Sequence, residues 1–139
     1  MRAMFMSKHF VTFYSPGSFV AEQTTQPIDA WDNATALALA SNLVERHGAR
    51  PYGFRFTTRT RGDADLDSKV AATSPMHYFN AKIETMAEVE AREPGSILAK
   101  NMRCNGWSHI VTTLSGYRWS APLKQDDVVL DATGAVMPR

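Results

Sequence analysis

Residues 52–61 alternate between two kinds of side chain, and this alternation constrains the fold more than any other feature of the sequence. Successive side chains on a β-strand point to opposite faces. One face of such a strand would carry Tyr52, Phe54, Phe56, Thr58 and Thr60. The other face would carry Gly53, Arg55, Thr57, Arg59 and Arg61. The sequence therefore predicts a strand with one face suited to a hydrophobic core and one face that carries three arginines.

The arginine row on this strand has two interpretations. Arginines on one strand face are spaced about 6.6 Å apart, and guanidinium groups bind phosphate oxygens in a two-pronged way and stack on flat rings. The row therefore favours a localised anion site. The alternative is a solvated strand face that discourages pairing with another strand edge. The spacing alone leaves both interpretations open.

The overall charge limits which anions such a site could serve. The 139 residues carry a formal net charge of +1, whereas general DNA- and RNA-binding proteins usually carry a strongly basic patch or a high pI. We therefore expect no general nucleic-acid binding, and any bound anion should be small. The single cysteine, Cys104, excludes an internal disulfide and indicates a reducing cytoplasm.

The hydrophobic share of 44% is typical of a globular protein that forms its own core, and no apolar run approaches the roughly 20 residues that span a membrane. We expect a single α+β domain over residues 9–131, with a flexible N-terminus at 1–8 and a frayed tail at 132–139. Its antiparallel sheet is expected to be built from hairpins, with one longer helix and two short helices packed on it.

The expected strands are rich in β-branched and aromatic residues and are bounded by turn signals. They cover residues 9–14, 18–23, 52–61, 69–73, 76–79, 107–114, 117–120 and 128–130. Residues 24–31 are expected to form a loop. Because proline cannot donate to a sheet ladder, the strand that Ser74 and Pro75 interrupt is expected to lie at an edge of the sheet or to be bulged there.

The longer helix is expected at residues 34–47, where alanine and leucine dominate. Asp32 is a suitable N-cap. At helical spacing, one face would carry Leu37, Ala40, Val44 and His47.

Capping signals predict the two short helices. Thr85 and Glu88 have the spacing of a capping box, so a helix should begin near Met86. Ser96 can cap a second helix over residues 97–104, which Gly106 would end.

The sequence gives little support for catalysis or metal binding. The histidines at 9, 47, 77 and 109 are scattered, and the one cysteine has no metal-ligand spacing around it. The acidic residues at 63, 65 and 67 lack the glycine and the distant glutamate of a calcium loop. Nucleophile elbows and glycine-rich phosphate loops are also missing from the sequence. We therefore expect no enzyme, no cofactor and no metal site.

A nucleotide-type pocket is better supported, because adenine-like rings are held by stacking and amide hydrogen bonds, and phosphates by arginine. The residues that could form such a pocket are Arg55, Arg59, Phe79, Asn101, Arg103, Asn105 and Arg118. The alternative for the neighbouring aromatic residues Trp107, Tyr117 and Trp119 is that they belong to an ordinary core.

Six segments together carry a family resemblance over most of the chain from residue 10 to residue 131. They are residues 10–17 (Phe-Val-Thr-Phe-Tyr-Ser-Pro-Gly), 51–59 (Pro-Tyr-Gly-Phe-Arg-Phe-Thr-Thr-Arg), 66–69 (Leu-Asp-Ser-Lys), 74–79 (Ser-Pro-Met-His-Tyr-Phe), 101–107 (Asn-Met-Arg-Cys-Asn-Gly-Trp) and 126–131 (Asp-Asp-Val-Val-Leu-Asp). In these segments the chain resembles small phage and prophage proteins, and it is similar to an anti-Thoeris family of molecular sponges. Members of that family capture cyclic ADP-ribose isomers made by the TIR enzyme of the defence system and hold them without cleavage.

The resemblance implies a phage anti-defence protein in the cytoplasm of an infected bacterium, assembled as a homodimer or larger homo-oligomer with ligand pockets between subunits. It also implies that an aromatic residue, an asparagine and arginines grip the ligand. The matching positions are Phe79, Asn101, Arg55, Arg59, Arg103 and Arg118. One alternative is an inhibitor or adaptor whose exposed aromatics bind a host protein. An enzyme that degrades the signal is a third possibility, for which the acid–base motifs are missing.

Overall fold

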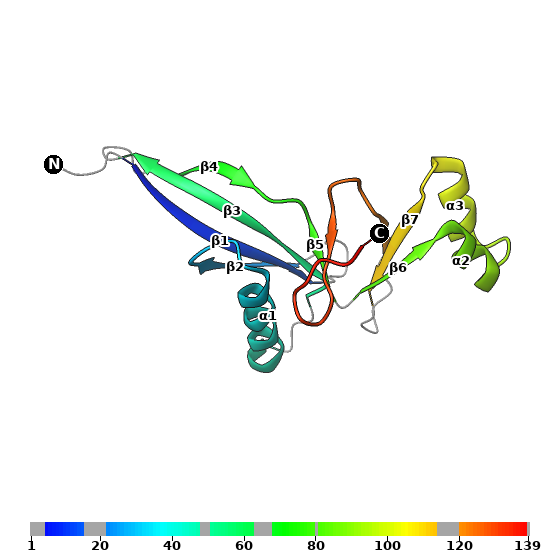
Figure 1. Ribbon diagram of the computed structural model, residues 1–139, viewed down its shortest axis with the longest axis horizontal. Helices are drawn as coiled ribbons and strands as arrows, with labels where there is room; N and C mark the ends of the chain where they lie inside the picture. Colours follow the sequence, from blue (N-terminus) through cyan, green and yellow to red (C-terminus); the bar gives the residue numbers. More distant parts are fainter. Residues whose placement is uncertain are drawn as a thin grey trace. The chain divides into compact units, whose positions relative to one another are not determined.

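A computed structural model of the chain describes residues 5–15, 22–47, 51–62, 68–79, 81–113 and 120–138. The chain divides into two compact units, unit 1 with residues 1–79 and 128–139 and unit 2 with residues 80–127. The described ranges contain three helices and two mostly antiparallel sheets (Figure 1), so the expected α+β class is confirmed. The expected division of the chain at residues 9 and 131 stays a prediction.

Unit 1 contains a six-stranded sheet. The strands along its main path are β2 (Glu22–Ile28), β1 (Phe5–Ser15), β3 (Gly53–Gly62), β5 (His77–Tyr78) and β9 (Val128–Val129), and β4 (Ser68–Thr73) also pairs with β3. The pairings of β1 with β2 and of β3 with β1, β4 and β5 are antiparallel, whereas β5 and β9 run parallel.

β1 and β2 pair antiparallel as expected for the first hairpin, but the bounds of the second strand differ from the prediction. Residues 24–28 were expected to be a loop, but they are part of β2, and residues 18–21 of the expected partner strand lie outside the described residues. The polar composition of β2 hides the strand from a sequence pattern. Its threonines nevertheless pair well, because Thr12 Oγ1 and Thr25 Oγ1 form a hydrogen bond of 2.8 Å across the two strands. β1 is also longer than expected, since it begins at Phe5.

The core of unit 1 lies on one face of this sheet. Phe54 and Phe56 are 0% and 2% exposed, which confirms the core face expected for β3. They pack with Val11 and Phe13 of β1. The Phe54 ring centroid lies 5.1 Å from that of Phe56 and 6.0 Å from that of Phe13, both in edge-to-face geometry.

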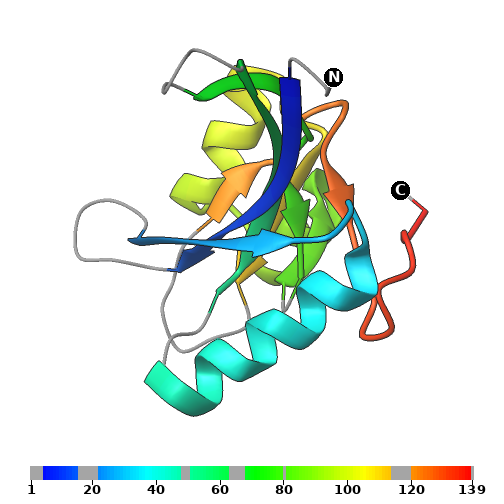
Figure 2. The same cartoon turned by 90° about the vertical axis from the view of Figure 1, so that its left-hand side faces the viewer.

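Helix α1 (Asn33–His47) packs against this core (Figures 1 and 2). Its buried residues are Ala36, Ala40 and Leu43. The expected face was therefore right at Ala40 and wrong at Val44, which is 40% exposed. Positions 36, 40 and 43 also follow helical spacing, and small alanines allow the helix to approach the sheet closely. The side chain of His47 is not among those that the structure describes.

The expected cap of α1 is confirmed. The Asp32 carboxylate accepts hydrogen bonds from the Thr35 backbone N–H at 3.2 Å and from the Thr35 hydroxyl. These bonds, led by the one from the hydroxyl, hold the pKa of Asp32 below its usual value.

The expected edge position is confirmed for β4 but not for the residues after the proline. Among the described strands, β4 pairs only with β3, whereas β5 lies between β3 and β9. The Phe56 N–H donates to Ser74 Oγ at 2.8 Å, and the Ser74 N–H donates to the Phe56 carbonyl at 2.9 Å. A side chain thus continues the ladder where the proline interrupts it. Further along, β5 approaches β3 so closely that a Cβ at Gly53 would lie 2.7 Å from the carbonyl oxygen of His77.

Unit 2 combines a three-stranded antiparallel sheet with two helices. The strands are β6 (Ala81–Thr85), β7 (His109–Thr113) and β8 (Ser120–Pro122), in that order, and the helices are α2 (Met86–Arg92) and α3 (Ile97–Asn105). The core consists of Val89, Ala99, Met102 and Ile110. Residues 114–119, which include the expected hairpin turn at Ser115 and Gly116, lie outside the described residues.

The predicted caps of both short helices are confirmed. Thr85 Oγ1 accepts from the Glu88 N–H at 3.2 Å, and Ser96 Oγ accepts from the Ala99 N–H at 3.0 Å. Gly106 ends α3 with a φ of 69°, a left-handed conformation that favours glycine. These short-range signals determine where both helices begin.

Candidate anion-binding site

The arginines of β3 lie on the sheet face opposite the core. In the β1–β3 register, Arg55 is opposite Thr12, Thr57 is opposite Phe10 and Arg59 is opposite Lys8. Directly opposite residues of an antiparallel pair project from the same face. We call this surface the arginine face, defined by Lys8, Phe10, Thr12, Tyr14, Arg55, Thr57 and Arg59. Helix α1 and the phenylalanine core cover the other side of the same strands.

Arg55 is the most unusual residue of the arginine face. Its side chain is half-buried, and its Nε is buried without a hydrogen-bond partner. The guanidinium also has no ion-pair partner in the part of the chain that the structure describes. Buried polar groups are almost always hydrogen-bonded, and a charged donor without a partner is especially costly. Arg55 therefore has the features of a residue that receives an anionic acceptor from outside the chain.

Three tyrosines lie close together near the end of β3 that carries Arg55. Tyr78 is opposite Gly53 in the β3–β5 pairing, and its ring stacks on that of Tyr52 with centroids 6.4 Å apart. Burial raises the pKa of the Tyr52 phenol, Tyr14 raises it further, and the positive charge of Arg55 lowers it. The phenol of Tyr52 therefore lies near both Tyr14 and Arg55. We call Tyr14, Tyr52 and Tyr78 the tyrosine cluster.

The position of Tyr52 differs from the expected alternation. The sequence placed it on the core face with Phe54 and Phe56, and it is indeed only 4% exposed. It is not part of the phenylalanine core, however, because it precedes the first residue of β3 and its ring stacks on Tyr78.

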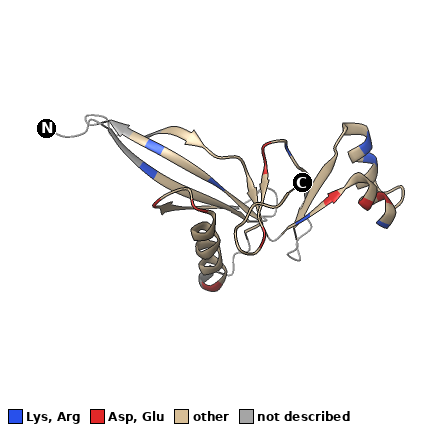
Figure 3. Ribbon diagram, in the orientation of Figure 1, with Lys and Arg blue, Asp and Glu red and all other residues tan. Residues whose placement is uncertain are grey.

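The arginine face is positively charged along its length. Lys8 and Arg59 are direct neighbours across β1 and β3, and like charges in this position destabilise a sheet. Lys8 is exposed and forms no ion pair with a described residue. Neither β1 nor β3 contains an acidic residue. The blue bands on these strands in Figure 3 mark their lysine and arginine positions. Such a surface attracts anions.

Phe79, expected to stack on a ligand ring, lies in the core of unit 1. It is 5% exposed, and its ring centroid lies 5.7 Å from that of Phe54. Its role in ligand binding stays a prediction. Arg118 lies outside the described residues.

The other three expected site residues lie on α3 of unit 2, and all are exposed. Arg103 forms an ion pair with Glu90. The side-chain amide of Asn105 donates to the backbone carbonyl of Asn101 at 2.9 Å. The structure thus brings Arg55 and Arg59 together on one sheet face of unit 1, and Asn101, Arg103 and Asn105 together on one helix of unit 2.

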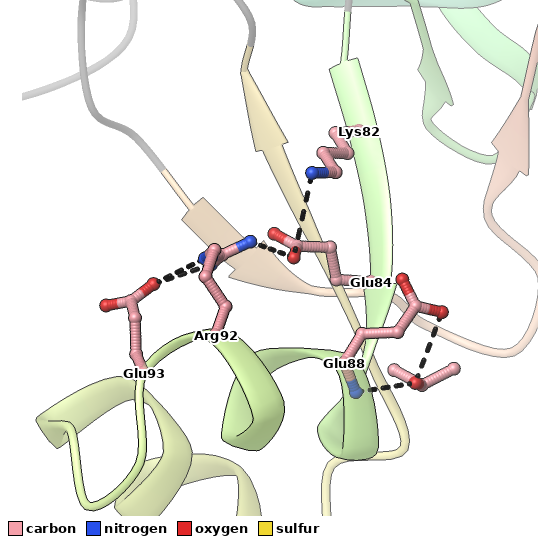
Figure 4. Close-up of polar contacts among 6 residues, drawn as sticks. Lys82, Glu84, Glu88, Arg92 and Glu93 are labelled. Carbon is pink, nitrogen blue, oxygen red and sulfur yellow. Dashed lines mark hydrogen bonds and ion pairs between the residues drawn. The ribbon is translucent and has the colours of Figure 1, made fainter.

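A charge network in unit 2 contrasts with the arginine face. Glu84 of β6 has a side chain only 4% exposed, and it forms an ion pair with Arg92, with Lys82 Nζ also 4.0 Å away (Figure 4). Arg92 Nη2 lies 2.6 Å from Glu93 Oε2. Hydrogen bonds to Glu93 and then to Glu84 raise the pKa of Arg92. In this network both cations have carboxylate partners.

Sequence patterns missed Lys8, Phe10, Tyr14 and Tyr78 as neighbours of the arginines. A usable signal was present in β1, where the buried residues Val11 and Phe13 alternate with Phe10, Thr12 and Tyr14. That alternation predicts which residues share a face. It does not predict that this face joins the arginine row, because that depends on the register between β1 and β3.

The histidines of unit 1 that the structure describes with their side chains have structural contacts. His9 Nδ1 lies 2.9 Å from Thr58 Oγ1. His77 is buried, and its Nδ1 lies 2.8 Å from the carbonyl oxygen of Pro75. Because a carbonyl oxygen can only accept, this nitrogen carries a proton. The described residues include no group of three or more His, Cys, Asp or Glu side chains placed to hold a metal ion.

Comparisons with known proteins do not place the chain in a family. No family model, curated protein or solved structure matches it. Within the described ranges, no helix is long and apolar enough to cross a bilayer.

Proposed function

We propose that the chain binds a small, phosphate-bearing ligand on the arginine face and holds it without cleaving it. The observation that carries this proposal is the half-buried Arg55, whose Nε is buried without a hydrogen-bond partner. A phosphate oxygen would satisfy this donor with a charge-assisted hydrogen bond, and arginine binds phosphate through two parallel bonds. Lys8 adds a second positive charge on the same face.

The composition of the arginine face supports binding rather than turnover. Its seven defining residues offer cations, hydroxyls and a phenyl ring, but no carboxylate and no imidazole. General acid–base catalysis at neutral pH is most often performed by such groups, because their pKa values can be brought near 7. A ligand on this face would meet groups that neutralise and orient its charge. The proposed activity is therefore sequestration.

For the identity of the ligand we propose a cyclic ADP-ribose isomer, which carries a diphosphate and an adenine ring. The six family-like segments support this choice, as does the near-neutral net charge of +1, which favours a small anion over a nucleic acid. The same proposal includes assembly into a homodimer or larger homo-oligomer and action as a phage anti-defence protein in the cytoplasm of an infected bacterium.

The proposal is tested by incubating the purified chain with a set of cyclic ADP-ribose isomers and filtering off the protein. We expect at least one isomer to be depleted from the filtrate. Heat denaturation of the retained protein should then release that isomer with unchanged mass. No depletion at micromolar protein would contradict binding, and an altered mass after release would contradict sequestration.

A second candidate function is binding to a host protein, and the exposure of Ile97 favours it. This residue begins α3 and is 78% exposed, and Val70 on the edge strand β4 is 51% exposed. Exposed apolar side chains of this kind can contribute to a protein interface. Co-purification with a host protein that is lost in Ile97→Ser but retained in Arg55→Gln would favour this candidate over ligand sequestration.

A further inference from the structure

Phe10 is a phenylalanine that the core of unit 1 leaves out. Its neighbours Val11 and Phe13 are 0% and 1% exposed on the core face. Phe10 projects from the opposite face and is only partly buried. The rings of Phe13, Phe54, Phe56 and Phe79 all contact another aromatic ring, whereas Phe10 has no ring contact with a described residue. Phe10 is therefore a partly exposed ring without an aromatic neighbour in the described part of the chain.

The cations of the arginine face flank Phe10 on both sides. Phe10 is directly opposite Thr57, so Arg55 and Arg59 are its two diagonal neighbours on β3. Diagonal neighbours on one sheet face lie roughly 7–8 Å apart, which is within reach of aromatic and long side chains. On its other side Phe10 is opposite Pro27 of β2. A ring and cations are therefore arranged within the span of one nucleotide.

Resting on the proposed function, we infer that Phe10 is the ring-stacking residue of this site. The base of a nucleotide ligand lies on the phenyl ring of Phe10 while its phosphates contact Arg55 and Lys8. Bases stack on aromatic side chains irrespective of their hydrogen-bonding edges, and phosphates prefer arginine. This assignment replaces the buried Phe79 by a partly exposed ring on the arginine face.

The inference is tested with two probes that differ in whether they contain a ring. Cyclic ADP-ribose carries a diphosphate and adenine, whereas inorganic pyrophosphate carries only the charge. We expect Phe10→Leu to weaken binding of cyclic ADP-ribose about tenfold and to leave pyrophosphate binding within about twofold, as measured by calorimetry. Phe10→Trp should retain or tighten cyclic ADP-ribose binding, and the new indole should report the ligand through quenched fluorescence. The matched control is Trp31→Leu, because Trp31 stacks on Phe56 on the core side of the sheet.

The outcomes separate this inference from the proposed function. If the wild type binds both probes but Phe10→Leu weakens them equally or not at all, the inference is wrong and the proposed function stands. If the wild type binds neither probe, both the inference and the proposed function are wrong.

A short oligothymidylate carries phosphates and bases in a polymer. If it binds more tightly than cyclic ADP-ribose and loses affinity in Phe10→Leu, the face serves single-stranded nucleic acid, which overturns the small-ligand inference.

Discussion

The arginine face of unit 1 and the charge network of unit 2 use the same residue types in opposite ways. In unit 2, Arg92 and Arg103 have carboxylate partners, and Glu84 is buried between two cations. On the arginine face, Arg55 has a buried Nε without a partner, and Lys8 is opposite another cation. A cation that is paired within the fold contributes to stability, whereas one that lacks a partner is available to bind a ligand.

This contrast separates the predicted site arginines by whether a described residue of the chain pairs with them. Arg103 was expected to bind ligand because asparagines and Trp107 lie close to it in the sequence. In the structure its guanidinium forms an ion pair with the carboxylate of Glu90. Arg55 has the same side chain without such a partner, so pairing within the chain distinguishes the two arginines.

The largest expected effect concerns these two arginines. Arg55→Gln should weaken binding of cyclic ADP-ribose about 100-fold, because losing one partner of a desolvated charge pair costs about 2–5 kcal/mol and each 1.4 kcal/mol is about tenfold. The matched variant Arg103→Gln should change affinity less than about twofold, since Arg103 is paired with Glu90. Calorimetry measures both. Equal losses in the two variants would remove the distinction between the two regions.

The next largest effect is on the stability of unit 2. Glu84→Gln removes the buried charge that pairs with Arg92, whose side chain is 43% exposed. Breaking a buried pair costs about 3–5 kcal/mol, and solvent around Arg92 reduces this, so we expect a loss of about 1–2 kcal/mol in the free energy of unfolding. Denaturant titration measures the loss.

The control Glu93→Gln affects an exposed pair and should lower the free energy of unfolding by less than about 0.5 kcal/mol. Undiminished ligand affinity in Glu84→Gln would show that the network is structural, and a large loss would argue against that.

A smaller effect is expected from salt. Raising the concentration of NaCl from about 0.1 M to about 1 M shortens the Debye length from about 10 Å to about 3 Å. We expect about fivefold weaker binding of pyrophosphate, because the cations of the arginine face are partly exposed to solvent. The salt dependence should be shallower in Lys8→Gln. Affinity that does not respond to salt would show that the charges of Lys8 and Arg55 do not contribute to binding.

The smallest expected effect concerns the carboxylate of Asp131, a charged group of unit 1 that has hydrogen-bond donors within the chain. The Asp131 carboxylate accepts from the Thr133 hydroxyl at 2.6 Å and from the Thr133 and Ala135 N–H groups. The Thr133 hydroxyl is the largest cause of the lowered pKa of Asp131. A carboxylate with a lowered pKa stabilises the fold above its unfolded pKa of about 4, and this contribution is lost as the pH falls through the folded pKa.

Wild type and Asp131→Asn should therefore differ by a constant amount in melting temperature above about pH 5, and the difference should shrink as the pH falls below about 4. Thermal unfolding across this pH range measures it. A difference that grows as the pH falls would contradict the lowered pKa.

Short-range signals in the sequence predicted much of the fold. The caps Thr85 and Ser96 determine helix starts through bonds to residues three positions away, and the alternation in β3 predicted which face meets the core. Residues 24–28 of β2 were missed because they are mostly polar, and only their pairing with β1 makes them part of a strand. The buried face of α1 was predicted in part: Ala40 and Leu37 contact the core but Val44 is exposed, because two stripes of small and apolar residues follow the same helical spacing.

The candidate site could be predicted only in part, because it depends on pairings between distant residues. The sequence identified Arg55 and Arg59 from a local pattern. The contact of Arg103 with Glu90 and the position of Phe10 beside the arginines depend on helix packing and strand register. A sequence pattern also gave no reason to prefer Phe10 over Phe79, since both occur in aromatic segments. The two rings differ in burial, because Phe79 is 5% exposed and Phe10 is only partly buried, and our inference of a stacking role for Phe10 uses this difference.

The most direct test of the central claim is to observe the arginine side chains individually by NMR during a titration with cyclic ADP-ribose. We expect the Nε–Hε signal of Arg55 to shift and saturate with the ligand, because this donor has no hydrogen-bond partner among the described residues. The signals of Arg92 and Arg103, which have carboxylate partners, should stay in place. Saturable shifts of Arg92 or Arg103 with an unchanged Arg55 signal would contradict the claim that Arg55 on the arginine face binds the ligand.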